Sequence, residues 1–176
     1  MVMGATSANL PFIFVPAGPM FRGNWRGQSL GSGTDVWKYW AELRAGNITE
    51  EQWEEMEAGI SRSFGTCMVM GTAATMMAIT EALGLSLPMS ATIPAPHAER
   101  FRSAESSGKV AAAMAKAKGP RPSEFLTPAS FRNAQVVLQA IGGSTNGLIH
   151  LTAIAHRSPH KIDLETFDRL GREVPV

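Results

Sequence analysis

The sequence predicts a helix-rich α/β chain in which one short strand precedes a series of helices. Its 176 residues, 44% of them hydrophobic, can bury a core and indicate one domain or part of a larger one. Residues 10–15, LPFIFV, are rich in Phe, Ile and Val and carry prolines at both ends, as expected of a buried strand. From Asp35 onwards, apolar side chains recur at helical spacing almost to the end of the chain.

The first half of the chain contains a predicted loop and two helices. Residues 16–33 are rich in glycine, which is typical of a loop that wraps around something. One helix runs from Asp35 to the stop at Gly46, and Thr49 with Gln52 forms the capping box of the next. The apolar stripes of these helices, in which we interpret the tryptophans as core residues, are Val36, Trp37, Trp40 and Leu43, then Trp53, Met56 and Ile60.

Further helices are predicted from their caps and stops. A helical pattern covers residues 70–83 and ends at Gly84, and an Ala-rich helix covers residues 97–118. Thr127 as N-cap and Pro128 at the first helical position predict a helix that reaches about Ile141. The last two helices are capped by Ser144 or Thr145 and by Asp163, and the final residues 174–176 resemble the start of a strand.

The overall charge and the single cysteine restrict the possible partners and the compartment. A net charge of +1 gives no reason to expect nucleic acid or an anionic membrane surface as a partner, while a small anionic substrate is compatible with it. Cys67 has no partner for an internal disulfide, which favours a reducing compartment, so we expect the cytoplasm. The first ten residues have the pattern of neither a signal nor a transit peptide.

Cys67 is the first candidate site residue. It lies among glycines and small residues in FGTCMVMGTAAT, just before a predicted helix. The partial positive charge of a helix N-terminus favours the thiolate form that nucleophilic attack or metal ligation requires. The alternative is a buried, inert cysteine, which is the commoner case for a single cysteine.

A second candidate is the anion loop at the start of a late helix. In IGGSTNGLIHL, two glycines precede the cap residues, so Gly143, Ser144, Thr145 and Asn146 present unpaired backbone donors that suit a carboxylate or a phosphate. An ordinary capped core helix explains the same pattern. The segment lacks the lysine of a Walker loop.

A third pattern, GQSLG around Ser29, matches the nucleophile elbow of a serine hydrolase. An elbow needs a strand immediately before the serine and a helix immediately after it, and the surrounding glycines do not predict either element. The histidines do not show the spacing of a zinc site and receive no ligand role; they are His97, His150, His156 and His160.

Six short motifs, taken in order, resemble one enzyme family along essentially the whole chain. They are GPM from Gly18, GSGT from Gly31, GTCMVMGTAATM from Gly65, EALGLSLP from Glu81, IPA from Ile93 and GGSTN from Gly142. This set is similar to the dihydroxy-acid dehydratase and phosphogluconate dehydratase superfamily. The segment DVWKYWAELRAGNIT from Asp35 looks most like the sugar-acid branch, whose members dehydrate arabinonate and xylonate.

The resemblance implies a hydro-lyase that converts 2,3-dihydroxy carboxylates, either sugar acids or branched dihydroxy acids, to 2-keto acids. It implies an iron-sulfur cluster of the 2Fe-2S or 4Fe-4S type, for which Cys67 matches one ligand, and Mg²⁺ that holds the substrate. It also implies a homodimeric or homotetrameric enzyme and a layered α/β domain around a largely parallel sheet, joined to a β-rich domain.

On this resemblance, residues 1–176 are the helix-rich central part of the N-terminal domain, without the C-terminal β-rich domain. The remaining cluster cysteines, the magnesium ligands and the catalytic base of the family have no counterpart here, so no catalytic residue is expected in this segment. We therefore expect the isolated chain to be inactive and poorly stable. Two other functions remain open on the residues alone: a noncatalytic anion-binding module and a serine hydrolase that uses Ser29.

Overall fold

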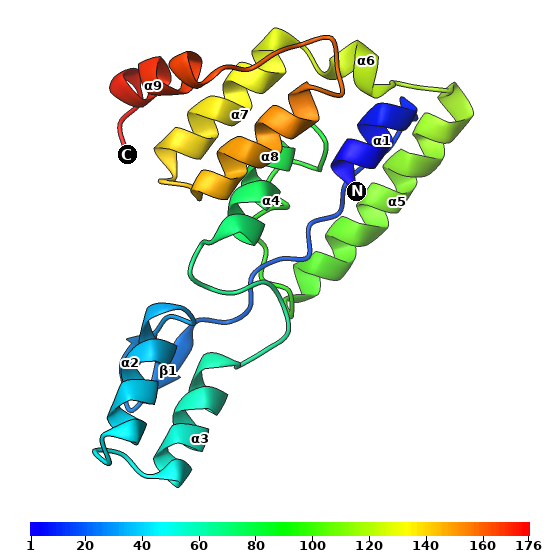
Figure 1. Ribbon diagram of the computed structural model, residues 1–176. Coiled ribbons are helices and arrows are strands. Elements are labelled where there is room, and N and C mark those ends of the chain that lie inside the picture. The colour runs from blue at the N-terminus through cyan, green and yellow to red at the C-terminus, as the bar shows by residue number, and fades with distance from the viewer.

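The glycine-rich stretch of this chain forms one β-hairpin, and the rest of the chain forms nine helices and their connections. The computed structural model describes residues 1–176 (Figure 1). In chain order the elements are α1 (Val2–Ala8), β1 (Gly23–Trp25), β2 (Gln28–Leu30), α2 (Thr34–Arg44), α3 (Glu50–Ile60), α4 (Thr72–Ala82), α5 (Ala98–Ala117), α6 (Pro122–Phe125), α7 (Pro128–Ala140), α8 (Thr145–Ala155) and α9 (Leu164–Glu173). The prediction of a helix-rich α/β chain is confirmed, and its one sheet is an antiparallel pair with Gly23 opposite Leu30.

The elements form two groups that are separated in space (Figure 1). The hairpin, α2 and α3 make a small unit at one end of the molecule, and the other helices make a larger body. The segments that enter β1 and leave α3 run side by side between the two groups, where Pro19 and Thr66 form an isolated parallel bridge. The segment between α3 and α4 that contains Cys67, called the cysteine segment below, therefore lies at the junction of the two groups.

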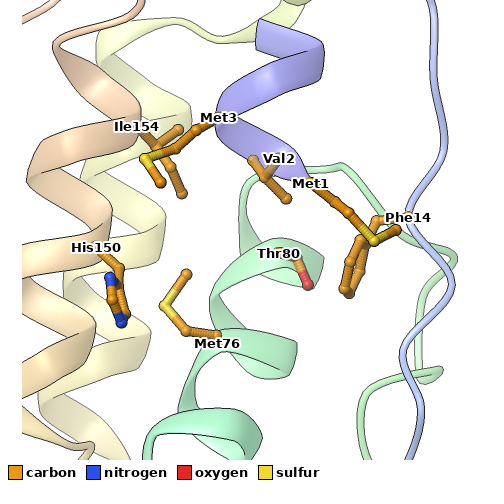
Figure 2. A pocket seen from close by; sticks show the side chains of 8 residues that line it. All are labelled: Met1, Val2, Met3, Phe14, Met76, Thr80, His150 and Ile154. Atoms are coloured by element: carbon orange, nitrogen blue, oxygen red, sulfur yellow. The ribbon is translucent and has the colours of Figure 1, made fainter.

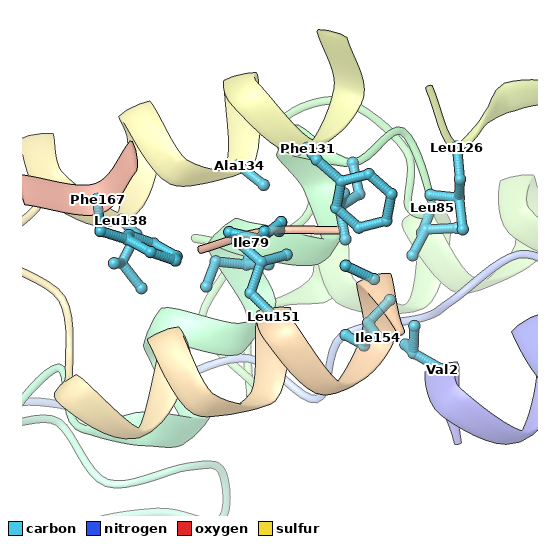
Figure 3. Packing of buried hydrophobic residues seen from close by; sticks show 13 residues of the cluster. Val2, Ile79, Leu85, Leu126, Phe131, Ala134, Leu138, Leu151, Ile154 and Phe167 are labelled. Atoms are coloured by element: carbon cyan, nitrogen blue, oxygen red, sulfur yellow. The ribbon is translucent and has the colours of Figure 1, made fainter. Parts of the chain in front are cut away.

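The core of the larger body lies where α4, α7 and α8 meet (Figure 3). Ile79 of α4, Ala134 of α7 and Leu151 of α8 are each 0% exposed, and Phe167 of α9 closes one end. Full burial of a Leu, Ile or Phe side chain contributes roughly 1.5–3 kcal/mol relative to exposure, so this three-helix contact is the main source of stability. It also fixes the start of α8 against the start of α4.

The small unit has its own core of Leu30, Tyr39, Met56 and Ile60. Gly59 of α3 lies so close to β1 that a β-carbon there would come 2.5 Å from the backbone oxygen of Asn24.

The interpretation of the tryptophans as core residues is wrong for two of them, because Trp37 is 73% and Trp40 is 43% exposed. Helix α3 and the hairpin cover only one face of α2, and the other face meets no further element. Trp53 is half-buried, and its ring lies 5.5 Å from that of Trp40.

Most predicted helix ends are confirmed because their caps form. Thr49 accepts a hydrogen bond from the Gln52 backbone N–H, and the Gln52 side chain accepts one from the Thr49 N–H, which completes the capping box of α3. Thr127 caps α7, Ser144 caps α8 and Asp163 caps α9 in the same local way. These signals act within four residues, so they hold whatever surrounds them.

The predicted strand at residues 10–15 is wrong. This segment pairs with no neighbouring strand, and its one backbone hydrogen bond runs from the Phe14 N–H to the Leu85 oxygen at 2.6 Å. Residues 16–33 are not entirely a loop, because β1 and β2 join through a two-residue turn. Arg26 and Gly27 have φ values of 50° and 82°, and a hairpin turn with two positive φ values matches the right-handed twist of its strands.

Two short helices, α1 and α6, were not expected from the sequence. α1 begins without a side-chain cap, and α6 spans a single turn. None of the helices combines the length and the apolar character that a membrane-spanning segment requires.

Candidate functional site

The two candidate motifs lie next to one another where α4 and α8 begin. The Ser144 backbone N–H donates to the Thr75 hydroxyl at 3.0 Å, and the Asn146 side-chain amide donates to the Thr72 hydroxyl at 2.9 Å. The Thr72 and Ser144 hydroxyls are 3.1 Å apart. Hydroxyls of α4 thus hold the start of α8, although the bonded residues lie 69 to 74 positions apart in the chain.

Glycine allows this close approach. A β-carbon at Gly143 would lie 2.9 Å from the Thr75 methyl group, and one at Gly147 would lie 2.8 Å from the same methyl and 2.7 Å from the Leu138 side chain. Gly142 has a φ of 56°, a left-handed conformation that glycine adopts at little cost. The two glycines that end α7 therefore do more than stop a helix, because they bring the capping residues of α8 onto α4.

Thr72 and Thr75 are the site residues that sequence reasoning missed. Thr75 is 0% exposed and Thr72 is half-buried, and both face the loop before α8. A possible signal was their spacing of three residues, which places two hydroxyls on one face of a largely apolar helix.

The prediction that all four residues of the anion loop present unpaired backbone donors is wrong for three of them. The Gly143 N–H donates to the Leu138 oxygen at 2.9 Å, the Ser144 N–H donates to Thr75, and Ser144 caps α8 by accepting from the Asn146 backbone N–H at 3.2 Å. The Thr145 N–H is the backbone donor that stays available. Thr145 and Asn146 are exposed, and the helix N-terminus adds partial positive charge at this point. Such an end can receive a carboxylate without a lysine or an arginine in contact.

Cys67 lies in the segment that leads into α4, four residues before the N-cap Gly71. Its thiol is half-buried and forms no disulfide. The chain turns back at Met70, where φ is 57°, so that the sulfur lies 3.7 Å from where a Gly71 β-carbon would be. Because Thr72 follows Gly71 directly, the cysteine and the hydroxyl pair of Thr72 and Ser144 belong to one region of the surface.

Large apolar side chains near Cys67 in the chain, and on the neighbouring segment, are exposed rather than buried. The exposed fractions are 45% for Phe21, 66% for Phe64, 45% for Val69 and 51% for Met70. The Phe21 N–H donates to the Ser63 hydroxyl at 2.9 Å, so these two segments are held together at this position. Exposed apolar side chains around a polar group are typical of a surface that another segment or domain covers.

The residues of this chain do not complete a metal site by themselves. No three side chains of His, Cys, Asp or Glu converge at any position. Cys67 can supply one thiolate to an iron-sulfur cluster, because the residue is only half-buried and its sulfur lies next to Gly71, which has no side chain. Further ligands, and the oxygen ligands that Mg²⁺ prefers, would have to come from other parts of a larger protein.

The elbow pattern around Ser29 does not form an elbow. Ser29 lies within β2, opposite Asn24, and is exposed. The next helix starts only at Thr34, so no helix follows the serine immediately, as an elbow requires. A serine nucleophile is therefore not favoured.

The histidines have other surroundings. His97 caps α5 by accepting from the Glu99 N–H at 3.1 Å, and the ring of His160 lies 5.9 Å from that of Phe131. His150 lines an apolar cavity of about 260 Å³ between α1, α4 and α8, together with Met76 (Figure 2). Only Thr80 and His150 contribute polar groups to this cavity, which makes it a poor site for a sugar acid.

Comparison with known proteins agrees with the resemblance that the motifs carry. The family model described as dihydroxy-acid/6-phosphogluconate dehydratase N-terminal matches residues 1–176. A 6-deoxy-6-sulfo-D-gluconate dehydratase of Pseudomonas putida is 42% identical over 100% of the chain, and an L-arabinonate dehydratase of Rhizobium leguminosarum bv. trifolii is 45% identical over 100%. A dihydroxy-acid dehydratase of Halothermothrix orenii is 39% identical over 99%. The chain spans 30% to 31% of the length of these relatives.

Proposed function

Because this chain belongs to the dihydroxy-acid/6-phosphogluconate dehydratase family, we propose that it is the Cys67-bearing part of an enzyme that removes water from a 2,3-dihydroxy carboxylate. The observation that carries the proposal is the placement of Cys67 directly before α4, whose Thr72 and Thr75 hold the anion loop of α8. A possible metal ligand and a possible carboxylate site therefore share one surface. The product would be a 2-keto acid.

We assign Cys67 the role of one thiolate ligand of an iron-sulfur cluster. When bound, the cluster supplies a Lewis acid for the departing hydroxyl. The proposal covers a cluster of either the 2Fe-2S or the 4Fe-4S type. It also includes Mg²⁺ that holds the substrate, for which this chain offers no carboxylate cluster. The exposed apolar side chains near Cys67 support the idea that another part of the protein covers this surface and completes the ligand set.

The loop Gly143, Ser144, Thr145 and Asn146 would hold the carboxylate of the substrate. The Thr145 N–H and the partial positive charge of the helix N-terminus favour an anion, and the position of the loop is fixed by hydroxyls rather than by charged side chains. Substrate affinity should therefore depend strongly on loop geometry and little on the protonation of any side chain within the loop.

A sugar acid is the substrate class we favour. The relatives named for L-arabinonate and for 6-deoxy-6-sulfo-D-gluconate are 45% and 42% identical to this chain, against 39% to 42% for relatives named dihydroxy-acid dehydratase. The similarity of these values makes the branched dihydroxy acids the second class. A homodimer or homotetramer in the cytoplasm is part of the same proposal.

The test compares Cys67→Ser with Ser144→Ala in the full-length protein reconstituted with iron and sulfide. Cys67→Ser should lower the iron bound per protein and abolish formation of 2-keto acid from L-arabinonate and from 2,3-dihydroxyisovalerate. Ser144→Ala should leave the iron content unchanged and raise KM. Wild-type iron content in Cys67→Ser would remove the proposed role of the cysteine, whereas binding of sugar acids without metal and without turnover would favour the noncatalytic anion-binding module.

A further inference from the structure

Arg100, near the start of α5, is a buried cation with no acidic partner. Its side chain is only 7% exposed, and no carboxylate lies within 4.0 Å of it, since the salt bridges of this chain involve other residues. Burial lowers the pKa of Arg100. Burying a guanidinium without a counter-ion is costly, so its hydrogen bonds must compensate.

Those hydrogen bonds go to three backbone carbonyls on two separate segments. One terminal nitrogen of Arg100 donates to the Pro16 oxygen at 2.8 Å. The other donates to the Ser90 oxygen at 2.9 Å and also to the Ile93 oxygen. The guanidinium therefore joins the segment before β1 to the segment before α5.

The segment that Arg100 holds at Pro16 continues into residues 18–20, which pair with Thr66 in the cysteine segment. The Thr66 N–H donates to the Gly18 oxygen at 2.9 Å, and the Met20 N–H donates to the Thr66 oxygen at 2.8 Å. On the opposite side, the Ala95 N–H donates to the Pro19 oxygen at 2.9 Å. Residues 18–20 are thus fixed between the segment before α5 and Thr66, the residue that precedes Cys67.

The fit at Gly18 leaves no space for another arrangement. Gly18 has a φ of 85°, and a β-carbon there would lie 2.7 Å from an Arg100 nitrogen and 2.8 Å from the Ala95 nitrogen. Gly65, just before Thr66, would bring a β-carbon within 2.5 Å of the Met20 nitrogen. Three layers of backbone are therefore in direct contact, with the Arg100 side chain at one end and Cys67 at the other.

We propose that Arg100 is a positioning residue for Cys67, acting through residues 16–20 and their bridge to Thr66. The part of this inference that concerns metal binding rests on the proposed function of Cys67 as a cluster ligand. Arginine suits the role because its planar guanidinium presents fixed donors to several carbonyls at once, whereas a lysine ammonium is a compact charge on a flexible stem.

Hydrogen exchange in the full-length protein without metal is the first test, with Arg100→Met, Arg100→Lys and the control Arg102→Met. Arg102 lies on the same helix, but it is exposed and pairs with Glu99. In Arg100→Met the amides of Met20 and Thr66 should exchange at least about tenfold faster, which corresponds to ~1.4 kcal/mol. Arg100→Lys should give a smaller increase and Arg102→Met none.

The amide of Leu151 in the core serves as an internal reference. Unchanged exchange at Met20 and Thr66 in Arg100→Met would overturn the proposal. An equal acceleration at Leu151 would also overturn it, because Arg100 would then stabilise the whole body rather than position one segment.

The second test measures iron content and the electron paramagnetic resonance spectrum of the reduced protein after reconstitution with iron and sulfide. Arg100→Met should bind at least about twofold less iron or show an altered spectrum. A wild-type spectrum and iron content, together with faster exchange, would mean that Arg100 does not position the thiol for metal binding. If Cys67→Ser binds as much iron as the wild type, the proposed function fails. The positioning role is then tested by the rate of alkylation of Cys67, which should differ between Arg100→Met and the wild type, and an unchanged rate would overturn it.

Gly18→Ala provides a second perturbation that keeps the arginine, should Arg100→Met fail to fold. Its new methyl group must displace the guanidinium or the Ala95 backbone. It should also accelerate exchange at Met20 and Thr66, and a protein with wild-type exchange at both amides would count against the proposed path from Arg100 to Cys67.

Discussion

Replacing Gly147 by alanine tests the contact that places the anion loop on α4. Gly147 is the third residue of α8, and a β-carbon there would lie 2.7 Å from the Leu138 side chain, 2.8 Å from the Thr75 methyl and 3.3 Å from the Ile79 side chain. Thr75 and Ile79 are each 0% exposed, and a β-branched threonine has little rotamer freedom in a helix. The new methyl group must therefore push α8 away from α4.

Two opposing terms set the size of the effect. Alanine is more favourable than glycine in a helix by about 0.8–1.0 kcal/mol. Overpacking of a close-packed core costs typically about 1–3 kcal/mol. The steric term is the larger, so we expect Gly147→Ala to lower the free energy of unfolding by roughly 1 kcal/mol.

Gly108→Ala is the matched control. Gly108 lies inside α5, it is exposed, and nothing lies within 4 Å of its added β-carbon. Only the helix term acts there, so this variant should gain about 0.8–1.0 kcal/mol. Urea unfolding of the two variants and the wild type, followed by circular dichroism, should place Gly147→Ala below and Gly108→Ala above the wild type. A Gly147→Ala protein as stable as Gly108→Ala would refute the close contact between α8 and α4.

Two further predictions concern the hydroxyl pair and one helix cap. Thr72→Val removes the acceptor for the Asn146 amide at 2.9 Å and the partner of the Ser144 hydroxyl at 3.1 Å, so KM for the dihydroxy acid should rise about tenfold, the effect of ~1.4 kcal/mol, with unchanged iron content. An unchanged KM would argue against the anion loop as the substrate site. The hydrogen bonds from Thr166 lower the pKa of Asp163, so the stabilisation from this carboxylate is present above the ordinary aspartate pKa of about 4 and is lost as the pH falls through the lowered pKa. Asp163→Asn should therefore remove part of the acid dependence of unfolding near and below pH 4 while it keeps the cap, and identical acid titrations of the two proteins would contradict this assignment.

The helices could be predicted from the sequence because their signals are local. A cap such as Thr49 with Gln52, or Thr127 with Pro128, involves atoms within four residues, and it forms as soon as the helix does. The same reasoning failed for residues 10–15, because an apolar run becomes a strand only if another strand lies beside it, and no strand does so here. It also failed for Trp37, because an apolar stripe shows which face can be buried but not whether another element covers it.

For the candidate site, the sequence by itself determined which residues are the candidates. Cys67 and the run from Gly143 to Asn146 were found from residue type and spacing, and the family followed from the order of the motifs. Only the tertiary structure decided that the two motifs share one surface, that Thr72 and Thr75 hold the anion loop, and that Arg100 binds the segment that pairs with Thr66. These hydrogen bonds join residues 69 to 84 positions apart, and those of the anion loop depend on the packing of α4 against α8, which no local pattern encodes.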